Sequence, residues 1–130
     1  MKIGIIGTGG IVTSAHIPNY VKAGMDVVAV MNRTRANGER VARQFGIPNV
    51  YENVEEMLKH EQLDAVSICT PNALRKEQVL LALEAGCHVL CEKPPGISEN
   101  EAVEMLEAAK RAGKHCITDS ITDIVRIRFC

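Results

Sequence analysis

The sequence predicts a doubly wound α/β domain, in which a parallel sheet lies between two layers of helices. Short runs of apolar, often β-branched residues alternate with segments of helical pattern along the chain. These runs are apolar on both faces, as expected for strands that helices cover on both sides. No linker-like segment interrupts the alternation. We therefore expect one three-layer αβα domain over residues 1–118 and an irregular tail over residues 119–130.

The first half of the chain is expected to hold three strands and three helices. The strands are predicted at Lys2–Ile6, Asp26–Met31 and Asn49–Tyr51, and the helices at Ile11–Ala23, Arg35–Phe45 and Val54–His60. Gly24 and Gly46 follow the first two helices, and glycine commonly ends a helix. Pro18 is an imperfection inside the first helix, because it has no backbone N–H to donate.

The second half continues the same alternation. Strands are predicted at Ala65–Cys69, His88–Cys91 and His115–Thr118. The helix between the first two of these strands is expected to run from Ala73 to Ala85, with Asn72 as its N-cap and Gly86 as its C-cap.

The last predicted helix runs to Arg111 and ends before Gly113. Ser98 and Glu101 form the S-x-x-E pattern of a capping box at its start. Three of its apolar residues are spaced by three and are expected to share one face: Val103, Leu106 and Ala109.

Charge and composition exclude several classes of partner. Lys and Arg number 15 and Asp and Glu number 16, so the net charge of −1 gives no reason to expect nucleic acid or an anionic membrane. The apolar stretches are far shorter than the roughly 20 residues that cross a bilayer. Five cysteines without CxxC spacing indicate reduced thiols. We therefore expect a cytoplasmic protein.

No metal site is expected. Cys87 and Cys91 fall on one face of a strand with His88 between them, but a metal would need more ligands than this arrangement offers. Small core residues are the simpler interpretation. Three further histidines have no evident partner in the sequence and are interpreted as surface or satisfied core residues: His16, His60 and His115.

A glycine-rich turn joins the first predicted strand to the first helix. Gly7-Thr8-Gly9-Gly10-Ile11 supplies a G-x-G pattern, with backbone amides at a helix N-terminus where a pyrophosphate could bind. Val12 occupies the place where the usual fingerprint has a third small residue, which weakens the match. A tight glycine turn without a ligand is the alternative.

The end of the second predicted strand bears on which dinucleotide would bind. Domains that bind NAD usually have Asp or Glu there, which accepts hydrogen bonds from the adenosine ribose. This chain has Asn32, followed by Arg33 and Arg35, and these donors tolerate a 2′-phosphate. NADP is therefore favoured over NAD. The alternative is that the two arginines only begin a solvated helix.

Further motifs resemble one family over residues 1–113. They are Cys69-Thr70-Pro71-Asn72 after a strand, EQVLLALEAG at 77–86 and HVLCEKP at 88–94, behind an opening GIIGTGGI with His16-Ile17-Pro18-Asn19-Tyr20. Together they resemble the glucose-fructose oxidoreductase and inositol dehydrogenase family (Gfo/Idh/MocA). Glu92-Lys93-Pro94 is the most specific of these marks.

The resemblance implies the N-terminal Rossmann domain of a nicotinamide-dependent oxidoreductase that transfers a hydride to or from a sugar, polyol or related hydroxyl compound. It also implies a role for each matching residue. The pyrophosphate would be cradled by Gly7, Thr8, Gly9, Gly10 and Ile11, and the adenosine ribose would be faced by Asn32 and Arg33. The cleft would be lined by Thr70, Pro71 and Asn72, and the nicotinamide-side ribose would be held by Glu92. Lys93 would be catalytic, by polarising a carbonyl or moving the hydroxyl proton.

Two departures from the family bear on activity. Arg75 stands where the family often has His, which alters a contact near the nicotinamide ribose or reads a phosphate instead. The family's second domain, which supplies the substrate pocket, is expected to be absent, so the chain would be incomplete for catalysis. The tail DSITDIVRIRFC suggests truncation, a frameshift or a rebuilt end. An exposed apolar interface would then favour homo-oligomers or poor solubility.

Two other functions remain open. One is a non-enzymatic nucleotide-binding or interaction module. The other, within the same family, is a redox-assisted lyase or glycosidase, in which the hydride returns to the substrate.

Overall fold

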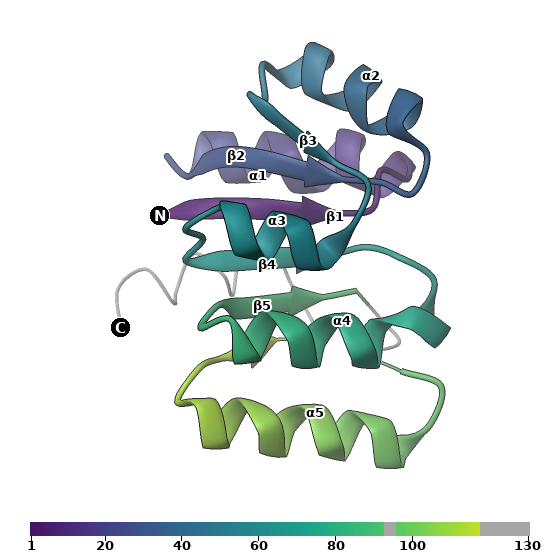
Figure 1. Ribbon diagram of the computed structural model, residues 1–130, viewed down its shortest axis with the longest axis vertical. Coiled ribbons are helices and arrows are strands. Elements are labelled where there is room, and N and C mark those ends of the chain that lie inside the picture. Colours follow the sequence, from purple (N-terminus) through teal and green to yellow (C-terminus); the bar gives the residue numbers. More distant parts are fainter. Residues whose placement is uncertain (93–95, 118–130) are drawn as a thin grey trace.

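The computed structural model describes residues 1–92 and 96–117. Within them, a single parallel sheet has the strand order β3-β2-β1-β4-β5-β6 (Figure 1). The strands are β1 (Lys2–Ile6), β2 (Asp26–Met31), β3 (Asn49–Tyr51), β4 (Ala65–Ile68), β5 (His88–Cys91) and β6 (Cys116–Ile117). This order is that of the doubly wound dinucleotide-binding fold. The predicted fold class is confirmed.

Helices cover both faces of the sheet. They are η1 (Val12–His16), α1 (Ile17–Lys22), α2 (Arg35–Phe45), α3 (Val54–His60), α4 (Asn72–Glu84) and α5 (Glu99–Ala112). One buried cluster contains residues of η1, α1 and α2, and the other contains residues of α3, α4 and α5. Figure 1 shows α3, α4 and α5 in front of the sheet and α1 behind it. The fold therefore has three layers.

The central strand β1 fixes where a ligand can bind. It pairs with β2 on one side and with β4 on the other, so that Ile5 lies between Val30 and Ser67. Both neighbours are parallel to β1, and the carboxyl ends of all three strands therefore meet at one edge. The chain order reverses between β1 and β4. Ligands of open α/β sheets bind at this kind of switch point.

The helix after β1 is irregular at its start. The predicted helix over Ile11–Ala23 is found as a π-helical turn, η1, followed directly by α1, which ends at Lys22. In the wide turn, the backbone N–H of Ile17 bonds the carbonyl of Val12, five residues earlier. Pro18 lies in the first turn of α1, where its missing N–H is tolerated. Val12 is fully buried in the core.

The helix α4 begins one residue earlier than predicted. Asn72 is its first residue and Pro71 is the N-cap, with no side-chain capping bond, so the assignment of Asn72 as the N-cap was wrong. Pro71 has an extended ψ of 143°, and its fixed φ suits the position before a helix. At the other end, Ala85 is the C-cap, so the assignment of Gly86 as the C-cap was also wrong; Gly86 follows it with a φ of +85°.

The helix α5 has the predicted N-cap but a different buried face. The Ser98 hydroxyl accepts a hydrogen bond from the Glu101 backbone N–H at 3.2 Å. Met105 and Ala109 are buried, whereas Val103 and Leu106 are about half exposed. The prediction that Val103 and Leu106 share the face of Ala109 was wrong, because each step of three falls about 60° short of a full turn. The spacing of four between Met105 and Ala109 stays closer to one line along the helix.

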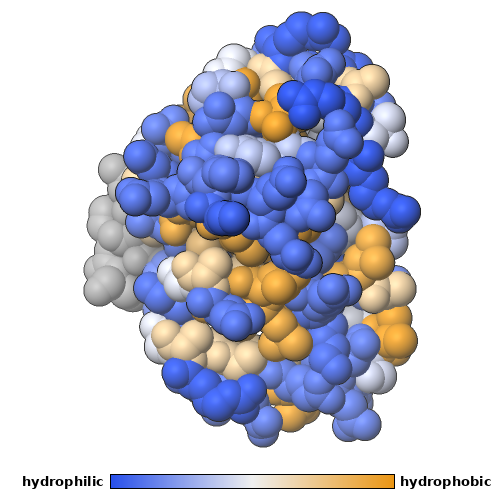
Figure 2. Space-filling model, in the orientation of Figure 1, coloured by the Kyte–Doolittle hydropathy of each residue, from blue (hydrophilic) through white to orange (hydrophobic). Residues whose placement is uncertain are grey.

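The outer surface over α3, α4 and α5 is mostly hydrophilic, with hydrophobic residues along the seam between α3 and α4 (Figure 2). A shallow groove there is lined in part by Leu58 and Leu81. Among the described residues, no helix has the length and apolar character needed to cross a membrane. Lys93, Thr118 and the predicted tail over 119–130 lie outside the described residues.

Candidate functional site

A cleft of about 590 Å³ opens at the carboxyl ends of β1, β2 and β4. This volume is in the range of small-molecule and cofactor sites. The cleft straddles the switch point between β1 and β4, where the fold predicts a ligand. Its walls are formed by Gly7, Thr8, Gly9, Met31, Asn32, Arg33, Cys69, Thr70, Pro71, Leu74 and Gln78.

Gly7 joins the ends of all three strands. Its φ of +101° lies in the region that favours glycine, and a Cβ atom there would lie 2.9 Å from the carbonyl oxygen of Cys69. Its backbone N–H donates to the carbonyl oxygen of Met31 at 2.9 Å. The turn after β1 can therefore pass close to β4 only because residue 7 has no side chain.

Gly9 and Gly10 are small for a different reason. A Cβ atom at either position would meet no described atom within 4 Å, and neither residue has a positive φ. The packing of the chain itself therefore does not require glycine at these positions. Gly9 lines the cleft, and a bare backbone there lets a ligand approach the amide groups closely. This open space fits a pyrophosphate.

Asn32 binds the glycine turn to the end of β2. Its side-chain Nδ2 donates to the Thr8 hydroxyl, and its Oδ1 accepts from the backbone N–H of Thr34 at 2.8 Å. Its own backbone N–H donates to the Tyr51 carbonyl at 3.0 Å. The amide is therefore held in a fixed orientation at the rim of the cleft.

The two arginines after β2 have different surroundings. Arg35 pairs with Glu39 at 3.0 Å and lies 3.8 Å from Glu52. Arg33 is exposed, lines the cleft and forms no ion pair with any residue that the structure describes. Arg33 is therefore the cation available to a ligand at this side of the cleft.

The opposite wall comes from the loop after β4 and the first two turns of α4. The Thr70 hydroxyl donates to Oε1 of Gln78, which is itself buried. Leu74 and Gln78 are four residues apart and share one face of the helix, the face that lines the cleft. Pro71 also lines the cleft, whereas Asn72 does not.

Arg75 is directed inward, although charged side chains are seldom buried. Its Nε donates to the Thr70 carbonyl at 2.7 Å, and one Nη donates to the Glu92 carbonyl at 2.9 Å. Only 9% of the residue is exposed. Arg75 therefore links the loop after β4 to the end of β5.

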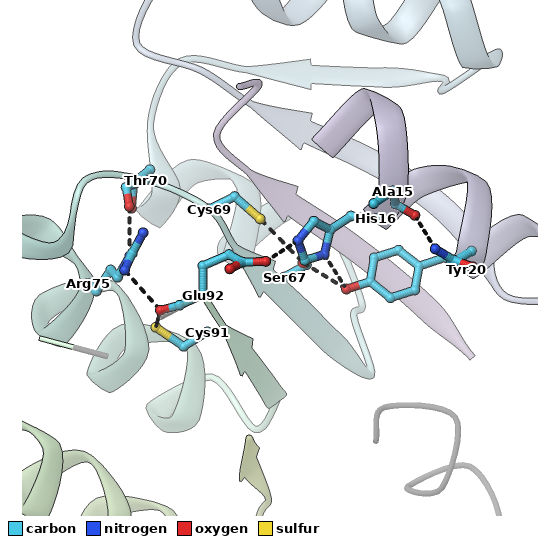
Figure 3. A network of polar contacts seen from close by, with 10 residues as sticks. Ala15, His16, Tyr20, Ser67, Cys69, Thr70, Arg75, Cys91 and Glu92 are labelled. Atoms are coloured by element: carbon cyan, nitrogen blue, oxygen red, sulfur yellow. Dashed lines mark hydrogen bonds and ion pairs between the residues drawn. The ribbon is translucent and has the colours of Figure 1, made fainter. Parts of the chain in front are cut away.

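A network of polar side chains lies beside this linkage (Figure 3). His16, from η1, bonds the Glu92 carboxylate through Nε2. Its Nδ1 lies 3.3 Å from the Tyr20 hydroxyl and 3.4 Å from the Ser67 hydroxyl, and Tyr20 donates to Ser67 at 2.8 Å. His16 is 1% exposed, whereas the Glu92 side chain is 33% exposed. The network thus reaches from the core to the surface.

Two groups in or beside this network, Tyr20 and Cys69, are uncharged. Burial raises the pKa of the Cys69 thiol to about 11, and burial also raises the pKa of Tyr20 above its ordinary value. Both groups therefore keep their protons at neutral pH. Among the described residues, no group of three or more His, Cys, Asp or Glu side chains could hold a metal ion.

The structure brings most of the predicted site residues together. Those that line the cleft are Gly7, Thr8, Gly9, Asn32, Arg33, Thr70 and Pro71. Gly10, Ile11, Asn72 and Glu92 lie outside its lining, and Lys93 lies outside the described residues.

Sequence reasoning missed four residues of the lining: Met31, Cys69, Leu74 and Gln78. The first two adjoin predicted residues at strand ends. The helical spacing of the other two could have indicated them.

The comparisons with known proteins agree with this geometry. A family described as "Oxidoreductase family, NAD-binding Rossmann fold" matches residues 1–120. The chain is 36% identical over 115 residues to D-glucoside 3-dehydrogenase of Escherichia coli (strain K12), with 88% of this chain and 33% of the relative covered. It is 37% identical over 113 residues to D-xylose 1-dehydrogenase (NADP(+)) 2 of Haloferax volcanii, with 87% and 35% covered.

A solved structure shares the fold. The crystal structure of an NAD binding oxidoreductase from Klebsiella pneumoniae superposes with a TM-score of 0.85 and 33% identity, and the match covers 92% of this chain and 34% of that one. The chain thus spans about a third of the length of the curated relatives it matches. The predicted family is confirmed: the chain belongs to the Gfo/Idh/MocA oxidoreductases and contains their NAD(P)-binding Rossmann domain.

Proposed function

We propose that this chain is the cofactor-binding part of an oxidoreductase that transfers a hydride between NADP and a sugar, polyol or related hydroxyl compound. The observation that carries the proposal is the cleft at the switch point, whose glycine turn leaves open space beside bare backbone. The dehydrogenase relatives named above support the substrate class, since D-glucosides and D-xylose are sugars or sugar derivatives.

In the proposed complex, the pyrophosphate lies against the turn from Gly7 to Ile11. Gly9 and Gly10 admit it because no side chain occupies the space beside them. The backbone amides at the start of the helix donate to phosphate oxygens. Thr70 and Pro71 form part of the opposite wall of the cleft, and Asn72 is the first residue of α4, directly after them in the chain.

The preference for NADP rests on the end of β2. Asn32 brings no negative charge to the rim, so a 2′-phosphate meets no repulsion from it. Arg33 is exposed beside it and is free of carboxylate partners among the described residues. A guanidinium can bond a phosphate through two N–H groups, which favours the phosphorylated ribose.

The reactive end of the proposed complex lies toward β5. Glu92 would accept hydrogen bonds from the nicotinamide-side ribose, and Lys93, which follows it in the sequence, would polarise the substrate carbonyl or move the hydroxyl proton. The nicotinamide itself supplies the hydride acceptor or donor. The small-molecule substrate would be held by a second domain, as the family resemblance implies.

The first test is a titration of the purified chain with NADPH and, separately, with NADH, followed by nicotinamide fluorescence and by calorimetry. We expect saturable binding with NADPH preferred. Arg33→Ala should weaken NADPH binding about tenfold or more, as expected for a lost charge-assisted contact, and change NADH binding little. Arg35→Ala is the matched control, because its guanidinium already faces Glu39 and Glu52.

Two results would contradict the proposal. Equal losses for both cofactors in Arg33→Ala would remove Arg33 as the selector. Failure to bind either cofactor would overturn the cofactor-binding proposal and favour the interaction-module alternative.

We further propose that the chain self-associates through exposed apolar side chains. Ile97, Val103 and Leu106 are each about half exposed or more, and they lie in or just before α5. Burial of such side chains against a second copy removes apolar surface from water. Sedimentation velocity across micromolar concentrations tests this, and Val103→Ser with Leu106→Ser should abolish the association. A strictly monomeric chain would contradict it.

A further inference from the structure

The side chain of Glu92 is held by a residue from the other end of the domain. His16 lies in the π-helical turn after β1, and its Nε2 bonds Glu92 Oε1 across 76 positions of sequence (Figure 3). His16 is almost fully buried, so its ring has little freedom. The contact therefore joins a fixed donor to a carboxylate that is one-third exposed.

The contacts around His16 are consistent with one direction of hydrogen bonding. An ionised carboxylate can only accept, so Nε2 must carry a proton where it faces Glu92. Tyr20 donates its hydroxyl proton to Ser67 at 2.8 Å, and the Ser67 hydroxyl lies 3.4 Å from Nδ1 and 3.7 Å from the Cys69 thiol. With the Ser67 proton directed at Nδ1, each group donates to the next and the series ends on the Glu92 carboxylate. A series of this kind would hold the ring in one tautomer, the one protonated on Nε2.

The backbone of Glu92 is fixed as well. Its N–H donates to the Ile68 carbonyl at 3.0 Å, and its carbonyl accepts from Arg75 at 2.9 Å. Cys91 pairs with Ile68 across β4 and β5, so Glu92 lies beside Cys69, which lines the cleft. The carboxylate is therefore held at a constant place next to the cleft wall.

We propose that His16 is a positioning residue that orients the Glu92 carboxylate toward the ribose hydroxyls on the nicotinamide side of the cofactor. This inference rests on the proposed function, in which Glu92 contacts that ribose. His16 occupies one carboxylate oxygen, and the other can accept hydrogen bonds from the ligand. Because the Glu92 side chain is already oriented, it loses less conformational entropy when the ligand binds. Tyr20 and Ser67 act through His16 by fixing its ring.

The test compares a whole cofactor with its adenosine half. NADPH has the nicotinamide-side ribose, whereas 2′,5′-ADP lacks it and still carries the 2′-phosphate. We expect His16→Leu and Glu92→Gln each to weaken NADPH binding about tenfold, the loss expected for a charge-assisted hydrogen bond, with little change for 2′,5′-ADP. The double variant should bind NADPH no more weakly than Glu92→Gln alone, because the two residues act as one unit.

His16→Gln is the conservative control. Its side-chain amide keeps an N–H donor at a similar reach, so NADPH binding should recover most of the loss seen in His16→Leu. A role for His16 in stability alone predicts a different pattern, in which NADPH and 2′,5′-ADP weaken equally. That pattern, or unchanged NADPH binding in His16→Leu, would overturn the proposal.

A measurement on the unaltered chain tests the inference even if a variant fails to fold. The imidazole ¹⁵N shifts of His16 should show the proton on Nε2 and an unprotonated Nδ1, and NADPH should shift the Nε2 signal more than 2′,5′-ADP does. A proton on Nδ1 with a bare Nε2 would overturn the inference. If the unaltered chain binds 2′,5′-ADP but not NADPH, the inference fails while the adenosine site stands. If it binds neither ligand, the proposed function itself fails.

Discussion

Arg75 on α4 donates a hydrogen bond from its guanidinium to the backbone carbonyl of Glu92 at the end of β5, over 2.9 Å. The same guanidinium donates through Nε to the carbonyl of Thr70 at 2.7 Å. A single planar group thereby sets the separation of two loops beside the cleft. The resemblance to the family marked this position only as a departure from the expected pattern and did not indicate these two bonds.

Replacing Arg75 by Lys should destabilise the fold. A lysine ammonium is a compact charge and cannot reproduce the fixed fork that bonds both carbonyls. We expect the free energy of unfolding to fall by about 1–3 kcal/mol, the usual result of losing buried hydrogen bonds. Urea denaturation measures it, and Arg43→Lys on the exposed side of α2 is the control, with a change below about 0.5 kcal/mol. Equal stability of the two variants would contradict the prediction.

Alanine at Gly7 should affect the stability of the fold, whereas alanine at Gly9 should affect cofactor binding. Gly7→Ala places a Cβ atom 2.9 Å from a backbone carbonyl oxygen at a φ of +101°, so we expect a loss of about 1–3 kcal/mol in the free energy of unfolding. Gly9→Ala meets nothing within 4 Å and should leave stability unchanged while weakening cofactor binding. Denaturation and NADPH titration of both variants separate the two effects. Normal cofactor binding by Gly9→Ala would argue against a pyrophosphate at this turn.

Asn32→Asp should shift the cofactor preference toward NADH. The new carboxylate can still accept from the Thr34 N–H and from the Thr8 hydroxyl, which is able to donate. It would also repel a 2′-phosphate and accept from an unmodified ribose hydroxyl. We expect the ratio of NADPH to NADH affinity to fall about tenfold or more. Asn37→Asp, an equal charge change on an exposed turn of α2, should leave the ratio unchanged.

Stability should decline above pH 9 because of buried thiols. Burial raises the pKa of Cys69 and Cys116 to about 11 and that of Cys91 to about 12, from an ordinary value of 9.0. Between pH 9 and these values, the unfolded chain loses protons that the folded chain keeps, so rising pH favours unfolding. Each such proton contributes about 1.4 kcal/mol per pH unit.

Urea unfolding at pH 8, 9, 10 and 11 measures this decline. Cys91→Ala should make it shallower, since one titrating group is removed. A free energy of unfolding that stays constant from pH 9 to pH 11 would contradict the assignment.

Local patterns predicted the elements well, because each one depends on a short stretch of sequence. The glycine turn from Gly7 to Gly10 follows a buried strand, and this context was enough to place the cleft at the carboxyl end of β1. The π-helical turn was not predicted, since Pro18 indicates an irregularity but not its geometry.

The contacts around Glu92 could not be predicted in the same way. His16 precedes it by 76 residues, and their contact exists only because the sheet places η1 and the end of β5 together. The inward direction of Arg75 likewise depends on carbonyl groups that no side-chain pattern reveals. The catalytic role of Lys93 stays a prediction.

The walls of the cleft come from residues 7–9, 31–33, 69–71, 74 and 78, and no single stretch of chain contains them. A ligand that bridges these walls can bind only after β1 has paired with β2 and β4, so it would oppose every partial opening that separates them. At a hundred times its dissociation constant, such a ligand would add about 2.7 kcal/mol to the stability of the native state. Resistance to proteolysis would then follow the supply of cofactor, and the abundance of the protein in a cell would depend on the concentration of its own ligand.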